Sequence, residues 1–174
     1  MSIYMVQQVF ARPDLEQEWN AWYADNLKVL MSVPGFRTGQ RFKAVEGVPP
    51  RYMAMYTVDS ADVFETQIYK DSGGGGTASQ RFRPAYQVWI RNLFEGVAVA
   101  PGVQEGECLL MLDADASNVQ LSGVSLAMMR CTGFHKTTSW RGLGTVDEAR
   151  VQSVPKTERL TIYRPISSQL GPLY

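Results

Sequence analysis

The sequence predicts an α+β fold in which one unit of four strands and two helices occurs twice in tandem, and two observations carry this prediction. Segments with strand and helix patterns follow each other as strand, helix, strand, strand, helix, strand over residues 1–100. Part of this pattern recurs in residues 101–174, where "GF" and "RLTIYRPIS" repeat the earlier "GF" and "YMAMYTVDS". We therefore expect two repeats, residues 1–100 and 101–174, packed as one compact unit.

The first strand and the first helix have clear boundaries. Residues 3–10 are rich in β-branched and aromatic side chains and end before Pro13, which is typical of a strand. Asp14 then suits a helix N-cap, with Gln17 three residues later as its partner. The apolar side chains that follow have helical spacing up to Pro34 and Gly35, so one helix face is expected to be buried: Leu15, Trp19, Trp22, Tyr23, Leu27 and Leu30.

The next segments complete the first repeat. Strands are predicted over residues 35–44 and 51–58, with a turn at 46–50 between them. The run "YMAMY" in the second of these strands is apolar without alternation, so both of its faces should be covered. A helix opened by Ser60 is predicted over 59–71 and a fourth strand over 86–99. This order of elements is the ferredoxin-like arrangement.

The second repeat is predicted to be truncated. Its first strand is expected at 106–114 and its helix at 118–131. His135 would begin its second strand, in the same strand position as Arg37, and 159–167 would form the third strand, with Tyr163 matching Tyr56. Too little chain follows for a further helix and strand. The sheet edge left open in this way would favour a homodimer.

Composition excludes several classes of function. Lys plus Arg and Asp plus Glu are equal at 17 each, so neither nucleic acid nor a membrane surface is an expected partner. The chain lacks a signal-peptide pattern and a run of about 18 apolar residues, and we expect a cytoplasmic protein. Cys108 and Cys131 have no metal-binding spacing, so both are expected to be reduced thiols.

Two segments carry a resemblance to a known family. "EWNAWYADNLKVLMSVPGF" and "RYMAMYTVDSADVFET" resemble the EthD-like branch of the dimeric α+β barrel superfamily. The resemblance covers residues 3–98 well and 106–167 weakly. It implies two ferredoxin-like units whose antiparallel sheets close a barrel with helices outside, and a cleft between helices and sheet. Some cofactor-free monooxygenases of this superfamily use Asn, Trp, Tyr and Arg in the cleft, and other members hold a haem. The resemblance therefore implies that the same residue types could act in this chain.

Asn26 is the first candidate for that cleft. It lies on the apolar stripe of the first helix, where a buried amide without a partner costs about 1 to 3 kcal/mol. Relatives of the EthD-like branch usually have histidine here, and an amide cannot exchange a proton near neutral pH. Asn26 is therefore interpreted either as a group that orients a substrate carbonyl or enolate, or as a satisfied structural amide.

Arginines and aromatic residues supply the other candidates. Arg37 and Arg41 share one face of a strand and Arg51 opens the next, so these cations meet either an anionic ligand or carboxylates and solvent. Arg41 is the better candidate because it lies deeper along the strand. The aromatic candidates line the cleft or belong to the core: Trp22, Tyr23, Tyr56 and Trp89.

Two other features argue against familiar sites. His135 is the single imidazole and has no second ligand at metal spacing, so no metal and no haem is the expected outcome. The loop "SGGGGTAS" around Gly73–Gly76 lacks the Lys-Ser/Thr of a phosphate loop and follows a helix. It is interpreted as a flexible loop, with a lid beside the cleft as the alternative.

The sequence thus favours a small cofactor-independent enzyme of aromatic or polyketide-type metabolism: an isomerase, cyclase, lyase or oxygenase. Its ligand would be a small apolar or aromatic carbonyl compound, with Asn26, Tyr23 and Arg41 as catalytic residues. The substrate-binding candidates are Trp22, Tyr56, Trp89, Arg37 and Arg51. A non-catalytic binding or accessory protein of the same fold is the alternative, and a haem-dependent enzyme is the third hypothesis.

Overall fold

The computed structural model describes residues 1–46 and 51–174, so the turn predicted at 46–50 lies almost wholly outside the described residues. Within them, eight strands pair antiparallel into a closed barrel with the order β1-β3-β2-β8-β5-β7-β6-β4. The strands are β1 (Ser2–Phe10), β2 (Phe36–Glu46), β3 (Tyr52–Val58), β4 (Tyr86–Glu95), β5 (Glu107–Ala114), β6 (Ala127–Phe134), β7 (Trp140–Asp147) and β8 (Leu160–Pro165).

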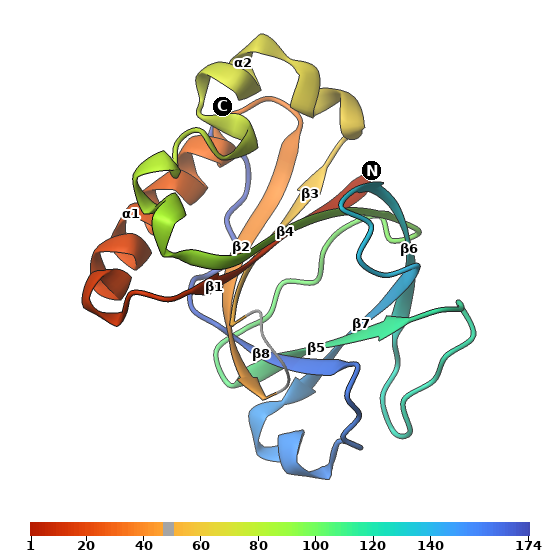
Figure 1. Ribbon diagram of the computed structural model, residues 1–174. Helices are drawn as coiled ribbons and strands as arrows, with labels where there is room; N and C mark the ends of the chain where they lie inside the picture. Colours follow the sequence, from red (N-terminus) through yellow and green to blue (C-terminus); the bar gives the residue numbers. More distant parts are fainter. Residues whose placement is uncertain (47–50) are drawn as a thin grey trace.

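The helices cover the strands of the first half of the chain. The α-helices α1 (Glu16–Met31) and α2 (Gln67–Asp71) lie on the outer side of these strands (Figure 1). Short 3₁₀ helices complete the elements: η1 (Pro13–Leu15), η2 (Ala61–Glu65), η3 (Gly74–Gly76), η4 (Gln80–Ala85) and η5 (Glu148–Ser153). Among the described residues, no helix combines the length and the apolar character that crossing a membrane requires.

The caps of the two predicted helices differ. The predicted cap by Asp14 is wrong, because the chain enters α1 through η1 and Asp14 instead pairs with Arg12. Ser60 does cap its helix, with its hydroxyl accepting from the Asp62 backbone N–H at 3.2 Å. That helix is not continuous, because η2 ends before Thr66, which caps α2 through the Tyr69 N–H.

The second half has a complete set of strands, which corrects the predicted truncation. No helix occupies 118–131, because β6 runs through its last residues and pairs with β4 and β7 to close the barrel. Residues 159–167 contain β8, the fourth strand of this half and not its third. The order β8-β5-β7-β6 therefore parallels β4-β1-β3-β2. The described strands leave no sheet edge open. An open edge therefore no longer supports a homodimer, and association stays a prediction.

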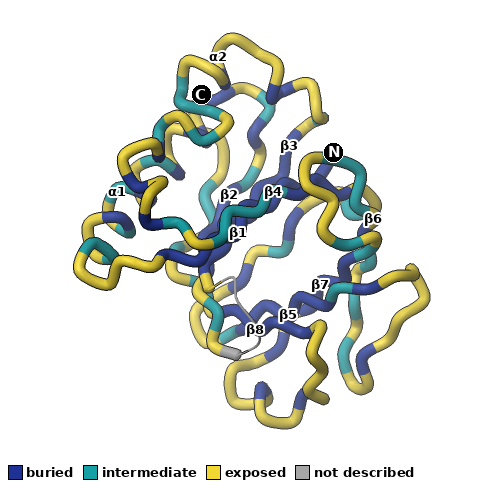
Figure 2. Tube along the Cα trace, in the orientation of Figure 1, coloured by how far each residue is buried: buried dark blue, intermediate teal, exposed yellow. Residues whose placement is uncertain are grey.

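Two layers of core lie on the two faces of the sheet. In β3, Tyr52, Ala54 and Tyr56 face α1, whereas Met53 and Met55 point into the barrel. This confirms that both faces of "YMAMY" are covered, and Figure 2 shows buried residues concentrated in the strands. Tyr163 belongs to the barrel interior, so its match with Tyr56 in the sequence does not reflect an equivalent position.

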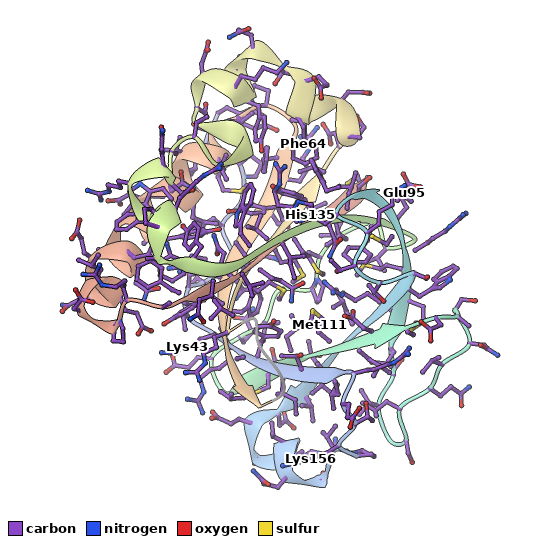
Figure 3. The ribbon with its side chains drawn as sticks, viewed as in Figure 1. Lys43, Phe64, Glu95, Met111, His135 and Lys156 are labelled. Carbon is purple, nitrogen blue, oxygen red and sulfur yellow. The ribbon has the colours of Figure 1, made fainter. Side chains whose placement is uncertain are left out.

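A polar cluster is buried among the apolar side chains of the barrel. Arg141 is only 1% exposed, donates to both carboxylate oxygens of Asp113 at 2.7 and 3.1 Å, and donates to Gln7 Oε1 at 2.9 Å. Gln7 in turn donates to the Tyr163 hydroxyl at 3.1 Å. Met111 lies beside this cluster, inside the barrel (Figure 3). The side-chain donors of Arg141 and Gln7 find acceptors within the cluster, which indicates a structural role.

Candidate functional site

A cleft lies on the outer face of the first half, between α1, the loop after α2, and the strands β1, β3 and β4. Its volume is about 50 Å³, and it is partly open to solvent. Its walls are aromatic and amide side chains and the glycine loop: Tyr4, Val6, Gln8, Trp22, Tyr23, Asn26, Leu30, Tyr56, Tyr69, Gly73, Gly74, Gly75, Gly76, Ala78, Ser79 and Trp89. None of these side chains is an acid, a histidine or a cation.

Local periodicity brings the walls together. Trp22, Asn26 and Leu30 are spaced by four residues, so they follow one stripe along α1. On β1, alternation points Tyr4, Val6 and Gln8 toward the helices, while Ile3 and Met5 enter the barrel. The register sets Trp89 of β4 opposite Gln8, so both contribute to the same end of the cleft.

Five of the eight candidate residues meet in this cleft: Trp22, Tyr23, Asn26, Tyr56 and Trp89. Asn26 is half-buried, and its side-chain amide makes no hydrogen bond to any residue that the structure describes. This geometry leaves the amide free toward the cleft and offers no partner for a purely structural role. The roles of the five residues in binding or catalysis stay predictions.

The three arginine candidates do not line the cleft. Arg41 is 4% exposed and lies behind Tyr23, with its guanidinium carbon 4.1 Å from the ring centre. Arg37 forms a two-point ion pair with Asp59, with both N–O distances 2.7 Å, at the surface. Arg51 is exposed at the start of β3. A ligand in the cleft therefore does not touch Arg37 or Arg51, and the Tyr23 ring separates it from Arg41.

The hydroxyl of Tyr56 is the unusual group of the site. Tyr56 is 0% exposed; the Tyr23 side chain lies near its hydroxyl, but no donor or acceptor among the described residues meets that hydroxyl with hydrogen-bond geometry. Burial raises the pKa of Tyr56 and of Tyr4 well above the ordinary value. Burial also raises the pKa of Tyr23 to about 12, although Arg41 opposes the shift. Tyr4, Tyr23 and Tyr56 therefore stay protonated near neutral pH and are hydrogen-bond donors, not bases.

Among the wall residues that sequence reasoning missed are Tyr4, Gln8 and Tyr69. The first two were readable, because Tyr4, Val6 and Gln8 alternate with residues that enter the barrel. Tyr69 had no such signal. Its place follows from the break between η2 and α2, which turns its hydroxyl to accept a hydrogen bond from the Gly75 N–H at 2.9 Å.

The glycine loop is folded closely against this site. A Cβ at Gly74 would lie 2.4 Å from the Tyr69 ring, and a Cβ at Gly76 would lie 3.0 Å from Trp89. Gly76 also has φ of 91°, which favours glycine. Glycine is thus required here by close approach to two aromatic rings. The loop lies where the lid alternative expected it, and its movement stays a prediction.

His135 does not provide a metal or haem site in the cleft. It is exposed in the segment between β6 and β7 (Figure 3), so its predicted place at the start of a strand, matching Arg37, is wrong. Its Nδ1 accepts from the Arg91 backbone N–H at 3.1 Å. The cleft walls hold no imidazole or thiol, so they do not fit a haem bound through histidine or cysteine. The described residues contain no group of three potential metal ligands.

Comparisons with known proteins establish the fold. No family model and no curated protein matches the chain. The crystal structure of an anthrone oxidase-like protein has a TM-score of 0.65 at 8% identity, covering 99% of this chain and 93% of that one. A putative chlorite dismutase has a TM-score of 0.55 at 7% identity, covering 96% of both chains. A putative monooxygenase from Fusobacterium nucleatum subsp. nucleatum has a TM-score of 0.53 at 10% identity, covering 99% of this chain and 96% of that one.

At these identities the likeness concerns the fold alone. It agrees with the α+β barrel type that the sequence predicts, with an antiparallel closed barrel and few helices. The EthD-like branch is not among these findings and stays a prediction.

Proposed function

We propose that this chain is a small enzyme that oxidises an aromatic or polyketide-type carbonyl compound with O₂ in the cleft and needs no resident cofactor. The observation that carries this proposal is the buried hydroxyl of Tyr56 without a hydrogen-bond partner, in the same cleft as the free amide of Asn26. An unpaired buried donor costs about 1 to 3 kcal/mol. Such groups are rare in native proteins, and a ligand oxygen is the acceptor that would satisfy this one.

The cleft chemistry suits an enolisable ketone. Tyr56 and Tyr23 are neutral donors, so they stabilise negative charge that develops on a ligand oxygen. Asn26 orients the same oxygen, and Trp22 and Trp89 form flat walls for aromatic rings. The nucleophilic carbon of the enolate takes up O₂ and a proton to give a hydroperoxide, R₂CH–OOH, which then loses water, so that R₂CH₂ and O₂ give R₂C=O and H₂O. This balance needs no external reductant.

The structural neighbours favour oxidation over isomerisation, cyclisation or lyase chemistry, because one is described as anthrone oxidase-like and another as a putative monooxygenase. The cleft of about 50 Å³ is narrow for a ligand of several rings. We infer that the loop Gly73–Ser79 moves outward as a lid to admit it.

We also propose that the two halves are repeats of which only the first retains its helices. Their strand orders agree, but the outer face of the second half is covered by η5 and by the segment before β6. Within residues 1–46 and 51–174, a cleft between an α-helix and the sheet therefore forms once.

Oxygen uptake with anthrone tests the proposal. The wild-type protein is expected to consume one O₂ per anthrone and to form anthraquinone, whereas 10,10-dimethylanthrone, which cannot lose the required hydrogens, gives no uptake. Tyr56→Phe and Asn26→Ala are expected to reduce kcat about tenfold or more, as loss of an oxyanion donor does. Asp25→Ala is the matched control, because Asp25 is exposed beside Asn26 and pairs with Lys28. Absence of uptake above the uncatalysed rate would refute oxidation of this substrate.

A non-catalytic binding protein is the second candidate, and one observation favours it. The cleft walls contain no carboxylate or imidazole that could carry a proton. Calorimetric binding of anthrone that Tyr56→Phe weakens, without any turnover, would support this candidate over the enzyme.

A further inference from the structure

We propose that the cleft takes its ligand as an oxyanion, an enolate or a phenolate, because Arg41 and Arg91 flank it with positive charge that no described carboxylate neutralises. This inference rests on the proposed function and names the ionic form of its substrate. It also assigns a role to Arg91, which lies beside the cleft and outside the predicted set of residues.

Arg91 lies on the cleft side of β4. The register sets Arg91 opposite Val6, two residues along the strand from the pair of Trp89 and Gln8. Val6, Trp89 and Gln8 all line the cleft. The guanidinium lies over two rings, 4.6 Å from the centre of Trp89 and 4.7 Å from that of Phe134. Its Nε is buried and has no acceptor among the described residues. A cation held in this way lacks a counter-charge.

The end of β6 and the residues that follow it hold Arg91 in place at a conformational cost. Phe134 and Lys136 have φ values of 61° and 49°, which side chains other than glycine rarely adopt. Phe134 nevertheless packs on Tyr4, with ring centres 5.3 Å apart, as well as on Arg91. His135 adds the hydrogen bond from the Arg91 backbone. The second half of the chain thus fixes a cation at the edge of a cleft in the first half.

Arg41 supplies positive charge at the other side. Its hydrogen bonds run to neutral acceptors, the Asn20 carbonyl at 3.3 Å and the Asn20 side-chain oxygen at 2.8 Å. It forms no ion pair within the described residues, and it stacks on the ring of Tyr23. Because Arg41 is almost fully buried, its charge is screened less than that of a surface arginine.

The cleft walls contain no aspartate or glutamate that could neutralise the charges of Arg41 and Arg91. The titratable wall groups are four phenols, Tyr4, Tyr23, Tyr56 and Tyr69. Arg83 of η4 adds a third cation at the rim, 5.0 Å from the Trp89 ring centre, and His135 is exposed behind it. The acids of α1 and α2 have partners of their own: Glu16 with Lys43, Glu18 with Arg81, Asp25 with Lys28, and Asp71 with Gln67.

This arrangement explains how a cleft without a base can act on an acidic ligand. The ligand loses its proton to bulk water, and the cleft binds the anion in preference to the neutral form. Tyr56 then donates to the oxyanion, while Arg41 and Arg91 stabilise its charge. No protein group needs to accept the proton.

Binding of 4-nitrophenol, compared with its methyl ether 4-nitroanisole, tests the inference. Absorbance separates phenol from phenolate, so a pH titration reports the ionisation of the bound probe. The bound probe is expected to ionise about one pH unit below the free probe, and the ether is expected to bind about tenfold more weakly than the phenolate. Arg91→Met should remove at least half of this preference, and Arg91→Lys should retain most of it. Arg130→Met, on the exposed part of β6, is the matched control and should change nothing.

Near-UV circular dichroism shows whether Arg91→Met remains folded, and Arg91→Gln serves if it does not. Equal binding of ether and phenolate, or an unshifted titration of the bound probe, would overturn the inference. If that result comes with oxygen uptake on anthrone, the proposed function stands and only the oxyanion preference fails. If neither 4-nitrophenol nor 4-nitroanisole binds and anthrone is not oxidised, both proposals fail.

Discussion

Replacement of Tyr56 by phenylalanine is expected to stabilise the free protein while weakening its binding of ligand. The Tyr56 hydroxyl is fully buried without a partner, and such a group costs about 1 to 3 kcal/mol. Removing it should recover about 1 kcal/mol of unfolding free energy, because the ring keeps its packing against Tyr4 and Phe36. For a chain of 174 residues this corresponds to a rise in Tm of about 2 to 4 °C.

Tyr163→Phe is the matched control, because it removes the same atom from another fully buried tyrosine. The Tyr163 hydroxyl accepts a hydrogen bond from Gln7 Nε2 at 3.1 Å, so its loss strands a buried donor. This variant should lose about 1 to 3 kcal/mol of stability. Urea denaturation followed by circular dichroism measures both changes, and calorimetry with 4-nitrophenol measures binding. If Tyr56→Phe and Tyr163→Phe destabilise the protein alike, the Tyr56 hydroxyl is satisfied in the free protein and the argument for the site is refuted.

Three further predictions follow from other contacts. Gly74→Ala should displace the loop and weaken binding of 4-nitrophenol with little change in stability, because the new Cβ would lie 2.4 Å from the Tyr69 ring; unchanged affinity in calorimetry would contradict this. Arg141→Met should cost about 1 to 3 kcal/mol in urea denaturation, because it removes the donor that satisfies the buried Gln7 Oε1 and leaves Asp113, whose side chain is 34% exposed, without its partner; no measurable loss would show that the cluster is dispensable. Burial raises the pKa of Tyr23 to about 12, above the unfolded value of about 10, so unfolding releases a proton between these values. Stability should therefore fall as pH rises from about 10 to about 12, and Tyr23→Phe should flatten that fall in urea midpoints measured across this range.

The first half of the fold was predictable because its signals are local. Helical spacing from Trp19 to Leu30 and the apolar run of β3 each identify one element with one environment. The second half failed for a physical reason. Helical spacing is present in this segment, at Leu121, Val124 and Met128. The strand β6 forms instead because it pairs with β4 and β7, and a local sequence pattern does not show this pairing, which closes the barrel.

The site was predictable to the extent that it lies on those local elements. Asn26 and its aromatic neighbours follow from the stripe of α1, and β1 carried an alternation that would have added Tyr4 and Gln8. Arg91 could not be found in this way. Its position depends on Phe134, which reaches it only because the two halves close one barrel.

The amide at position 26 and the two arginines without a carboxylate partner are electrostatically compatible. A histidine there would accept a proton, but the positive charge of Arg41 and Arg91 beside the cleft would oppose the charged imidazole. The same charge favours an anionic ligand, which needs donors and not a base. Asn26, Tyr23 and Tyr56 are all donors at neutral pH. An amide in place of a proton carrier is therefore consistent with the electrostatics of this cleft. The pKa of the substrate then determines which compounds the cleft binds, because only an ionised ligand gains from the positive charge.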